Sequence, residues 1–438
     1  MLLAYESPFV VWLAHIPMVI LTKGEHIQMV SGKCVDRDMM GIFRESVGDG
    51  ITVARAEKWR KTRRLMNPAF SANMLRQYAV VFSQQARMLA KKLAEQADTG
   101  RQFDLWPYMA NANVDIITEN ITGCKLHTQD VSENEFSQAL IKTLKLESLR
   151  LVLPWLLSPT LFYLYRLFTG NEDVFRKLRK LPRQVRSDGG GCGGGAAESN
   201  TLLDILLEAR ETNAQLDEKQ IHDEMLNVIV TGSESTAVTG SFVLLLLAMH
   251  PDIQEKVHQE VTAVFATDTD EYEHRDSSMA SVEKLGQLKL VDQCVKETLR
   301  IFTLFPLTIR KTSDEIRLDD ELVIPANCQV AMALHGVHLD PLLYPNPTVW
   351  NPRNFETEAV ERRPKYSYLA FGSGPRSCIG TKYAILSLKA QIARVVLDYR
   401  LETSVRYTDL RPVMDAIVRN KFGYPVRLRS RRKSLNER

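Results

Sequence analysis

The sequence lacks any uninterrupted apolar run of about twenty residues, the length that a bilayer-spanning helix needs. Residues 8–21 are apolar, but His15 and Pro17 interrupt them and the polar segment Lys23 to Glu25 follows. Because valine and isoleucine are frequent in this stretch, it predicts two short strands joined by a turn. The first residues also show no signal-peptide pattern.

The sequence also has little net charge and no regular cysteine spacing. The net charge is +3 over 438 residues, and no basic-aromatic pattern is present, which argues against a nucleic-acid partner. Neither a CxxC pair nor zinc-ligand spacing occurs among the six cysteines, which are Cys34, Cys124, Cys192, Cys294, Cys328 and Cys378. In a chain of this length, such usage is typical of a reducing compartment rather than of a disulfide framework.

One of these cysteines stands in a turn rich in glycine, between Phe371 and Gly380. A strongly apolar helix is predicted directly after Gly380, so the Cys378 thiol would lie before a helix N-terminus, where the backbone dipole favours an anion. Arg376 adds a positive charge that favours the thiolate. Such a thiol suits a metal ligand or a nucleophile. It is equally compatible with a buried structural cysteine, because free cysteine is among the most buried residue types.

A long apolar helix is predicted over residues 223–250, with a polar centre from Thr231 to Thr236. A carboxylate and several hydroxyls in an apolar helix need partners or a cavity. The hydroxyls could bond back to the preceding turn and bend the helix. Alternatively, the helix is open beside a ligand, and Glu234 with Ser235 or Thr236 handles protons.

Two pairs of residues are spaced to share a helix face. Trp59 and Arg63 lie four apart, which fits a surface stack or a ligand contact, and Glu297 and Arg300 lie three apart among apolar residues. The second pair is predicted to be buried and structural. Coarsely, the pattern predicts a strand-rich start over 1–55, helices over 75–145 and 251–303, strands over 307–310, 315–318 and 329–332, an irregular loop before the cysteine turn, and short strands over 400–438.

Two further segments have unusual composition. Residues 151–168 are aromatic and aliphatic but contain two prolines, so they fit a loop that dips into a membrane interface or a helix pair in the core. Residues 187–197 are rich in glycine and fit no phosphate-binding pattern, which indicates a flexible linker inside one domain.

In this order and at these separations, the motifs resemble the cytochrome P-450 family over essentially the whole chain, most closely its eukaryotic family-4 clan of insect type. The pattern Phe-x-x-Gly-x-Arg-x-Cys-x-Gly from Phe371 resembles the haem-thiolate loop of that family. The resemblance implies that Cys378 is the axial ligand of a haem iron, and that the haem is also contacted by Trp59, Arg63, Arg310, Phe371 and Arg376. It assigns proton delivery to Glu234, Ser235 and Thr236, and structural support to Glu297, Arg300 and Asn354.

The same resemblance implies the fold and the cofactor. The fold would be mainly α with smaller β-sheets (α+β), a single catalytic domain over 1–438 with haem b between the long central helix and the helix after the cysteine. The resemblance also implies an N-terminal membrane anchor before the first strands, and this form of the protein is expected to lack it. Thr231 stands where many clan members have a glutamate esterified to the haem, so no such link is expected. Asn354 stands at a usual arginine position, so an amide would complete the Glu297–Arg300 network.

The implied function is a monooxygenase that inserts one oxygen atom of O₂ into a lipophilic substrate. Electrons would come from NADPH through NADPH-cytochrome P-450 reductase, with cytochrome b5 as a second donor, and the basic residues of 58–64 would dock the reductase. The apolar substrate pocket would involve the loop before Gly48 and residues 228–233, 305–309 and 416–417. The protein would lie on the cytoplasmic face of the endoplasmic reticulum membrane, attached through 8–21 and 151–168. The alternatives are a haem-thiolate isomerase that needs no reductase and a non-catalytic or degenerate haem or lipid carrier.

Overall fold

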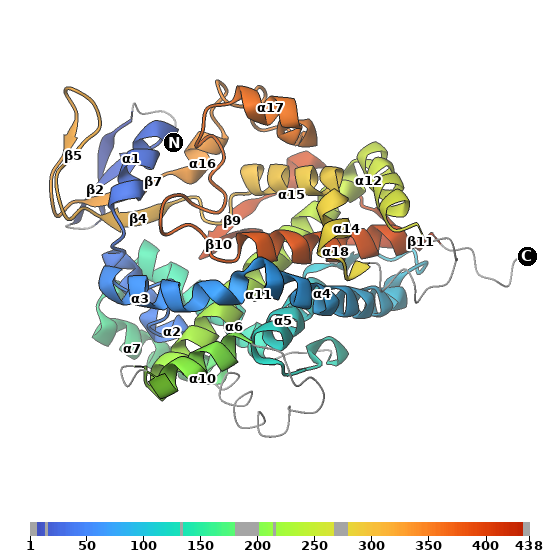
Figure 1. Ribbon diagram of the computed structural model, residues 1–438, viewed down its shortest axis with the longest axis horizontal. Coiled ribbons are helices and arrows are strands. Elements are labelled where there is room, and N and C mark those ends of the chain that lie inside the picture. The colour runs from blue at the N-terminus through green and yellow to red at the C-terminus, as the bar shows by residue number, and fades with distance from the viewer. Residues whose placement is uncertain are drawn as a thin grey trace, which may run out of the picture.

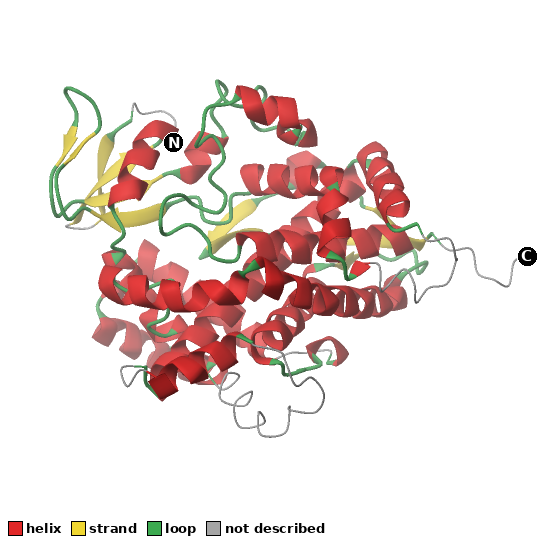
Figure 2. Cartoon of the chain, viewed as in Figure 1, coloured by secondary structure: helices red, strands yellow, loops and turns green. Residues whose placement is uncertain are grey.

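The computed structural model describes residues 7–13, 16–131, 135–179, 201–212, 216–266 and 279–431. Helices fill most of the molecule, and the largest sheet lies at one end, beside the N-terminal residues (Figure 1; Figure 2). The fold is therefore mainly α with several small β-sheets, as the sequence predicts. The glycine-rich stretch 187–197 lies outside the described residues.

Helix α11 (Glu218–Met249) runs through the middle of the helical part (Figure 1). Its N-terminus is capped by Asp217, whose side chain accepts a hydrogen bond of 2.7 Å from the Gln220 N–H. Among the described residues, it is the one helix long and apolar enough to cross a bilayer, but 83% of its most apolar window is buried within the protein. A helix that is apolar on most sides is usually a core helix, and α11 is one.

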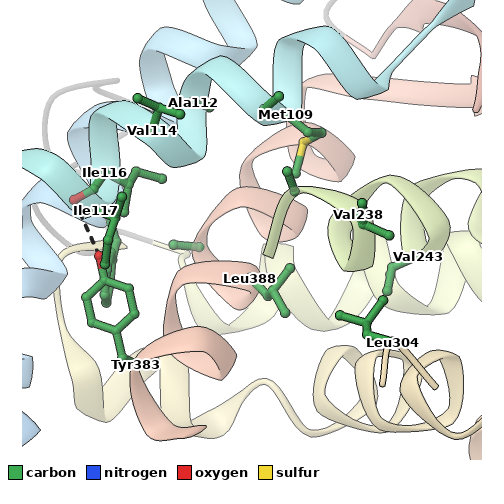
Figure 3. Close-up of a cluster of buried hydrophobic side chains, with 14 of the residues drawn as sticks. Met109, Ala112, Val114, Ile116, Ile117, Val238, Val243, Leu304, Tyr383 and Leu388 are labelled. Atoms are coloured by element: carbon green, nitrogen blue, oxygen red, sulfur yellow. Dashed lines mark hydrogen bonds between the residues drawn. The ribbon is translucent and has the colours of Figure 1, made fainter. Parts of the chain in front are cut away.

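The helices that pack against α11 include α5 (Trp106–Thr122), α15 (Lys289–Ile301) and α18 (Thr381–Asp398). Figure 3 shows Met109 of α5 and Leu388 of α18 meeting near Val238 of α11, all three within the main hydrophobic core. The Tyr383 hydroxyl of α18 donates a hydrogen bond of 3.3 Å to the Ile116 carbonyl of α5. These contacts fix the helix that follows the cysteine turn.

The remaining helices surround this core. They are α1 (Gly24–Lys33), α2 (Arg44–Val47), α3 (Ala56–Met66), α4 (Ala72–Leu93), α6 (Glu135–Val152), α7 (Pro159–Phe168), α8 (Glu172–Leu178), α10 (Leu202–Thr212), α12 (Pro251–Val264), α14 (Val282–Gln287), α16 (Leu334–His338) and α17 (Thr357–Arg362). Short 3₁₀ helices include η2 (Asp38–Phe43), η5 (Thr128–Asp130), η6 (Pro154–Leu157) and η7 (Pro352–Phe355).

The largest sheet has the strand order β1-β2-β7-β4, with β2 and β7 parallel and the other neighbours antiparallel. Its strands are β1 (Phe9–Leu13), β2 (Ile16–Leu21), β4 (Thr308–Lys311) and β7 (Gln329–Met332). Three smaller sheets pair β5 (Ile316–Arg317) with β6 (Val323–Ile324), β9 (Pro412–Asp415) with β10 (Ile417–Asn420), and β11 (Pro425–Ser430) with both β3 (Phe103–Asp104) and β8 (Tyr399–Glu402).

The sequence prediction of two strands within 8–21 is confirmed by β1 and β2. The prediction that residues 1–55 are strand-rich is wrong for 24–33, which form helix α1. Ile27 and Val30 lie three apart on this helix and are fully buried against the sheet residues Leu21 and Val330. The short helices η7 and α17 also interrupt the segment before the cysteine turn that is predicted to be an irregular loop. Short helices carry too few periods to be recognised from sequence.

Candidate functional site

The cysteine turn is fixed by its own backbone and by helix α1. The Cys378 N–H donates to the carbonyl of half-buried Phe371 at 2.9 Å, and the Ser373 hydroxyl donates to the Ser31 hydroxyl at 2.8 Å. Gly374 has φ 68°, and a Cβ built there would lie 2.2 Å from the Ser31 carbonyl oxygen. Only glycine fits this position, so the turn is seated closely on α1.

The Cys378 side chain is accessible to solvent, yet burial raises the pKa of its thiol. Solvent therefore reaches this side chain, while the protein around it disfavours the charged thiolate. The Gly380 N–H and the Thr381 hydroxyl act in the opposite direction and lower this pKa, as do the charges of Arg63 and Arg37. The sequence pointed to Arg376 as the favouring charge and did not single out Arg37, which lies close enough to the thiol to act on it.

The other described cysteines are less suited to ligation. Cys34, Cys124 and Cys294 are buried, and Cys328 is half-buried. Burial raises the pKa of Cys34 and raises that of Cys294 far above its ordinary value. No group of three or more His, Cys, Asp or Glu side chains that could hold a metal occurs in the described part of the chain.

Arg376 and Trp59 meet beside the cysteine turn, with the guanidinium 4.5 Å from the centre of the indole ring. Arg376 donates to the carbonyls of Val35 at 2.8 Å and of Ile51 at 3.2 Å, and also to that of Ala54. Arg63, one turn after Trp59 on α3, donates to the Ser377 carbonyl at 2.9 Å. The predicted residues of α3 and of the turn are therefore brought together, although Trp59 stacks on Arg376 and not on Arg63.

Arg310 and Arg37 complete a cluster of guanidinium groups with Arg376. Burial and the other two charges lower the pKa of Arg310 well below its ordinary value. Within the part of the chain that the structure describes, none of the three forms an ion pair with a carboxylate, and the Nε atoms of Arg310 and Arg37 are buried without a partner. Buried charges are normally paired, so this cluster fits a ligand that carries carboxylates. Sequence reasoning missed Arg37, which belongs to no recognisable motif.

The polar centre of α11 forms an unbroken helix. The hydroxyls of Thr231, Ser233, Ser235 and Thr236 each donate to the carbonyl four residues earlier, at 2.7–2.8 Å. The hydroxyls are thus satisfied locally, as one of the two sequence alternatives expected. Thr231 and Ser235 are nevertheless half-exposed in a helix that is otherwise buried, so this face of α11 borders open space.

Glu234 has a different environment from Ser235. Successive helical residues are turned by about 100°, and Glu234 is buried against Arg419 of β10 at 2.8 Å and Trp106 of α5 at 3.3 Å. Burial raises the pKa of Glu234, while Arg419 and Trp106 lower it. These two partners come from distant segments of the chain, so no local pattern in the sequence predicted them.

The Glu297–Arg300 pair is fully buried and bidentate, with both N···O distances at 2.8 Å. Arg300 also donates to the carbonyls of His338 and Pro347 at 2.7 Å each. Asn354 donates to Glu297 at 3.0 Å, so the amide contact expected from the sequence is present. His338, which the sequence analysis did not single out, links this group to Leu369 before the cysteine turn through a hydrogen bond of 2.7 Å from the Leu369 N–H.

Comparison with known proteins identifies the family. Residues 4–423 match the family model described as "Cytochrome P450". The chain belongs to the cytochrome P450 family. Cytochrome P450 4c3 of Drosophila melanogaster is 28% identical over 444 residues, covering 96% of this chain and 81% of that protein. Cytochrome P450 4V2 is 27% identical over 441 residues in Mus musculus and 26% over 438 in Homo sapiens, covering 96% of this chain and 82% of each relative.

These relatives support membership of family 4. A cytochrome P450 is a haem-thiolate monooxygenase that uses haem b bound through a cysteine thiolate, and its family generally relies on a redox partner and lipophilic substrates. The residues around the cysteine turn fit that group. An accessible thiol lies close to the guanidinium cluster, in which Arg310 and Arg37 each have an unpartnered Nε and no member forms an ion pair with a carboxylate of the described residues. Haem b carries two propionates.

Proposed function

We propose that this chain is a single catalytic domain in which Cys378 is the axial haem ligand, and that it oxidises a lipophilic substrate with electrons from NADPH through a reductase. The observation that carries the assignment is the accessible Cys378 thiol near the guanidiniums of Arg310, Arg376 and Arg37, which form no ion pair with a carboxylate among the described residues. One main hydrophobic cluster that runs from Val47 to Leu428 supports the single domain.

When bound, haem b supplies the activation of O₂, and thiolate donation favours O–O cleavage. The chain would hold the two propionates through Arg310, Arg376 and Arg63, with Trp59 packed on Arg376. Charge-assisted hydrogen bonds of this kind are about twice as strong as neutral ones. The half-buried ring of Phe371 would pack beside the thiolate. Thr231 lacks a carboxyl group, so no ester link to the haem is proposed.

Proton delivery is assigned to the face of α11 that borders open space. Ser235 is half-exposed there, and its hydroxyl is held by the Thr231 carbonyl at 2.7 Å. Thr236 follows it, and buried Glu234 is the acid of the group. Because Glu234 is paired with Arg419 at 2.8 Å, it would reach Ser235 only when that ion pair opens.

The substrate pocket is assigned to apolar segments around residues 305–309 and 416–417. Phe305, Leu307 and Met414 are exposed large apolar side chains, and the Val418 N–H donates to the Leu304 carbonyl at 2.9 Å, which joins two of these segments. Ala416 forms the tip of the β9–β10 hairpin with φ 59°. These residues favour a lipophilic substrate such as a fatty acid, hydrocarbon, isoprenoid hormone or plant toxin.

The reductase, with cytochrome b5 as a second donor, is proposed to dock on the basic face of α3. Arg60, Lys61 and Arg64 are exposed there, and Arg63 joins α3 to the cysteine turn. Lys58 is half-buried and paired with Asp49 at 2.9 Å, so it contributes less to this face. A clustered charge of one sign accelerates the association of an oppositely charged partner.

Attachment to the cytoplasmic face of the endoplasmic reticulum membrane is proposed through two exposed apolar surfaces. Trp12 on β1 is 66% exposed, Trp155 in η6 is 60% exposed and Phe168 at the end of α7 is 84% exposed. Exposed aromatic side chains of this kind insert into the membrane interface. The alternative of a helix pair in the core fits the opposite side of the same segment, where Leu156 and Phe162 are buried in the main hydrophobic core.

The decisive experiment tests the haem ligand and the enzymatic turnover separately. Cys378→Ser should lose the thiolate-type band of the reduced carbon-monoxide complex, whereas Cys328→Ser should keep it. NADPH consumption with purified reductase and a lipid panel then tests monooxygenation. A thiolate spectrum without turnover would exclude the monooxygenase and favour a carrier or an isomerase, and a retained band in Cys378→Ser would exclude the ligand assignment.

A further inference from the structure

The segment from Val47 to Ala54, called here the 47–54 loop, lies between helix α11 and the arginines near Cys378. On the α11 side, three of its N–H groups are held by side chains of that helix. The Asp49 N–H donates to Asp223 at 3.1 Å, the Ile51 N–H to Glu224 at 2.7 Å and the Thr52 N–H to Asn227 at 3.1 Å. The loop is thus fastened to the same helix that carries Ser235.

On its other side, the loop presents carbonyl oxygens to two of the clustered arginines. The Ile51 carbonyl accepts from Arg376 at 3.2 Å, and the Ala54 carbonyl accepts from the same guanidinium. The Thr52 carbonyl accepts from Arg37 at 3.2 Å. These carbonyls accept some of the N–H groups of each guanidinium and therefore set the direction in which the guanidinium points.

One peptide group joins the two sides directly. The peptide between Ile51 and Thr52 gives its N–H to Asn227 and its carbonyl to Arg376. Because a peptide group is planar and stiff, its direction is fixed at both ends. A continuous chain of hydrogen bonds therefore runs from the Asn227 amide through this peptide to the Arg376 guanidinium.

The fastening on α11 is buried and close. Glu224 and Asn227 are fully inaccessible to solvent, and the Asn227 amide also donates to the Val47 carbonyl at 3.3 Å. A Cβ built at Gly50 would lie 2.7 Å from the Asn227 Cβ and 2.9 Å from the Asp223 carbonyl oxygen. The loop therefore lies directly on the helix, with no room for water between them at this point.

We propose that Glu224 and Asn227 are positioning residues for Arg376, the proposed propionate ligand, and for its neighbour Arg37, acting through the 47–54 loop. This inference rests on the proposed function, since it takes Arg376 as a propionate ligand. The loop aims the guanidiniums of the cluster, and α11 aims the loop. Helix α11, which carries Ser235, and the arginines proposed to bind the propionates are thereby held in a fixed position relative to each other.

The test uses the purified haem-containing protein and measures haem loss as transfer to excess apomyoglobin. Asn227→Leu and Glu224→Leu should each release haem about tenfold faster, as outer-shell substitutions commonly do. Glu224→Gln keeps an acceptor for the Ile51 N–H and should restore slow release. Thr52→Val, which removes a hydroxyl that also donates to Asn227, is the mild variant if the others fold poorly, and it should accelerate release to a smaller extent.

A matched control comes from a second carboxylate that holds a loop elsewhere. Asp115 of α5 is buried and accepts from the N–H groups of Thr128 at 2.8 Å and Gln129 at 3.1 Å. Asp115→Leu should destabilise the protein without changing haem release below its unfolding transition. The propionate bands in resonance Raman spectra should shift in the α11 variants and remain unchanged in Asp115→Leu.

The outcomes separate this inference from the proposed function. Arg376→Leu should itself accelerate haem loss, and if it does not, the assignment of Arg376 is wrong. If Arg376→Leu accelerates loss but the α11 variants behave like Asp115→Leu, only the positioning role is wrong. In protein reconstituted with haem dimethyl ester, which lacks propionate charge, the α11 variants should lose their effect. A persisting effect there would contradict the proposed route through the arginines.

Discussion

Arg300 in the Glu297 pair and Arg310 and Arg376 near Cys378 are all buried, but their counter-charges differ. Arg300 meets Glu297 through two parallel hydrogen bonds of 2.8 Å, and its remaining N–H groups reach backbone carbonyls. Arg310, Arg376 and Arg37 meet backbone carbonyls, a threonine hydroxyl and an indole ring, but no carboxylate in the described part of the chain.

The difference shows which group finds its counter-charge within the chain. The Glu297–Arg300 pair does so and is called here the complete group. A buried ion pair with good geometry holds its surroundings in place, and removal of one partner leaves an uncompensated charge. A buried arginine without an anion carries its desolvation cost in the free protein, and a ligand with carboxylates offsets that cost on binding. The Glu297–Arg300 pair therefore stabilises the fold, and the arginines near Cys378 are suited to bind a ligand that carries carboxylates.

The largest expected effect follows from breaking the complete group. Arg300→Ala leaves Glu297 buried without its partner and should lower the free energy of unfolding by about 3–5 kcal/mol. Urea denaturation measures this loss. The double variant Glu297→Leu/Arg300→Met, which removes both charges, should recover much of it. A loss below 1 kcal/mol in Arg300→Ala would show that the pair is not what holds this region.

The next effect concerns pH and Glu224, the buried carboxylate behind the 47–54 loop. Burial raises the pKa of Glu224 to about 7, and Asp223 and Asp49 also raise it, while Lys58 and the Ile51 N–H lower it. The folded protein therefore binds this proton more tightly than the unfolded chain does, so stability falls as the pH rises from about 4.5 through 7.

Glu224→Gln removes that loss while keeping an acceptor. Relative to the unmodified chain, it should gain about 3 kcal/mol between pH 4.5 and pH 8. Urea titrations of both proteins across this range provide the comparison. If the free energy of unfolding changes with pH in the same way in both proteins, Glu224 has the same pKa in the folded and unfolded states. Its burial then does not destabilise the folded protein at high pH.

A smaller effect is expected for Arg310→Met, which should stabilise the haem-free protein but weaken haem binding. Arg310→Met removes a buried charge, so the haem-free protein should unfold at a higher urea concentration. The same variant loses a charged partner for a propionate, worth about 1.5–3 kcal/mol, so haem should dissociate roughly 10-fold to 150-fold faster. Destabilisation of the haem-free protein comparable to that of Arg300→Ala would make Arg310 structural and remove the contrast between the two groups.

The smallest effect tests the outer part of the complete group. Asn354→Ala deletes the hydrogen bond of 3.0 Å to Glu297 and should cost about 1 kcal/mol, because Asn354 is half-exposed and water can replace part of the contact. Asn354→Asp should cost more, because it places a second carboxylate beside Glu297. Equal stability of the two variants would show that the amide contact contributes little.

The sequence predicted much of the site where the signal is local. The cysteine turn, the helix after it, the long helix over 223–250 and the spacing of Glu297 and Arg300 all depend on neighbouring residues, and the structure contains each of them. Helix α1 was missed because ten residues with two glycines resemble a loop. Its helical state is decided by burial of Ile27 and Val30 against the sheet.

By itself, therefore, the sequence determined the family, the cysteine turn and the order of the main elements, because periodicity and turn chemistry are local properties. Only the tertiary structure decided that Glu234 pairs with Arg419 and that the 47–54 loop links Asn227 to Arg376. The physical reason is the nature of the partners. Backbone carbonyls and N–H groups occur at nearly every position, so no residue pattern marks the few that a guanidinium or carboxylate will meet.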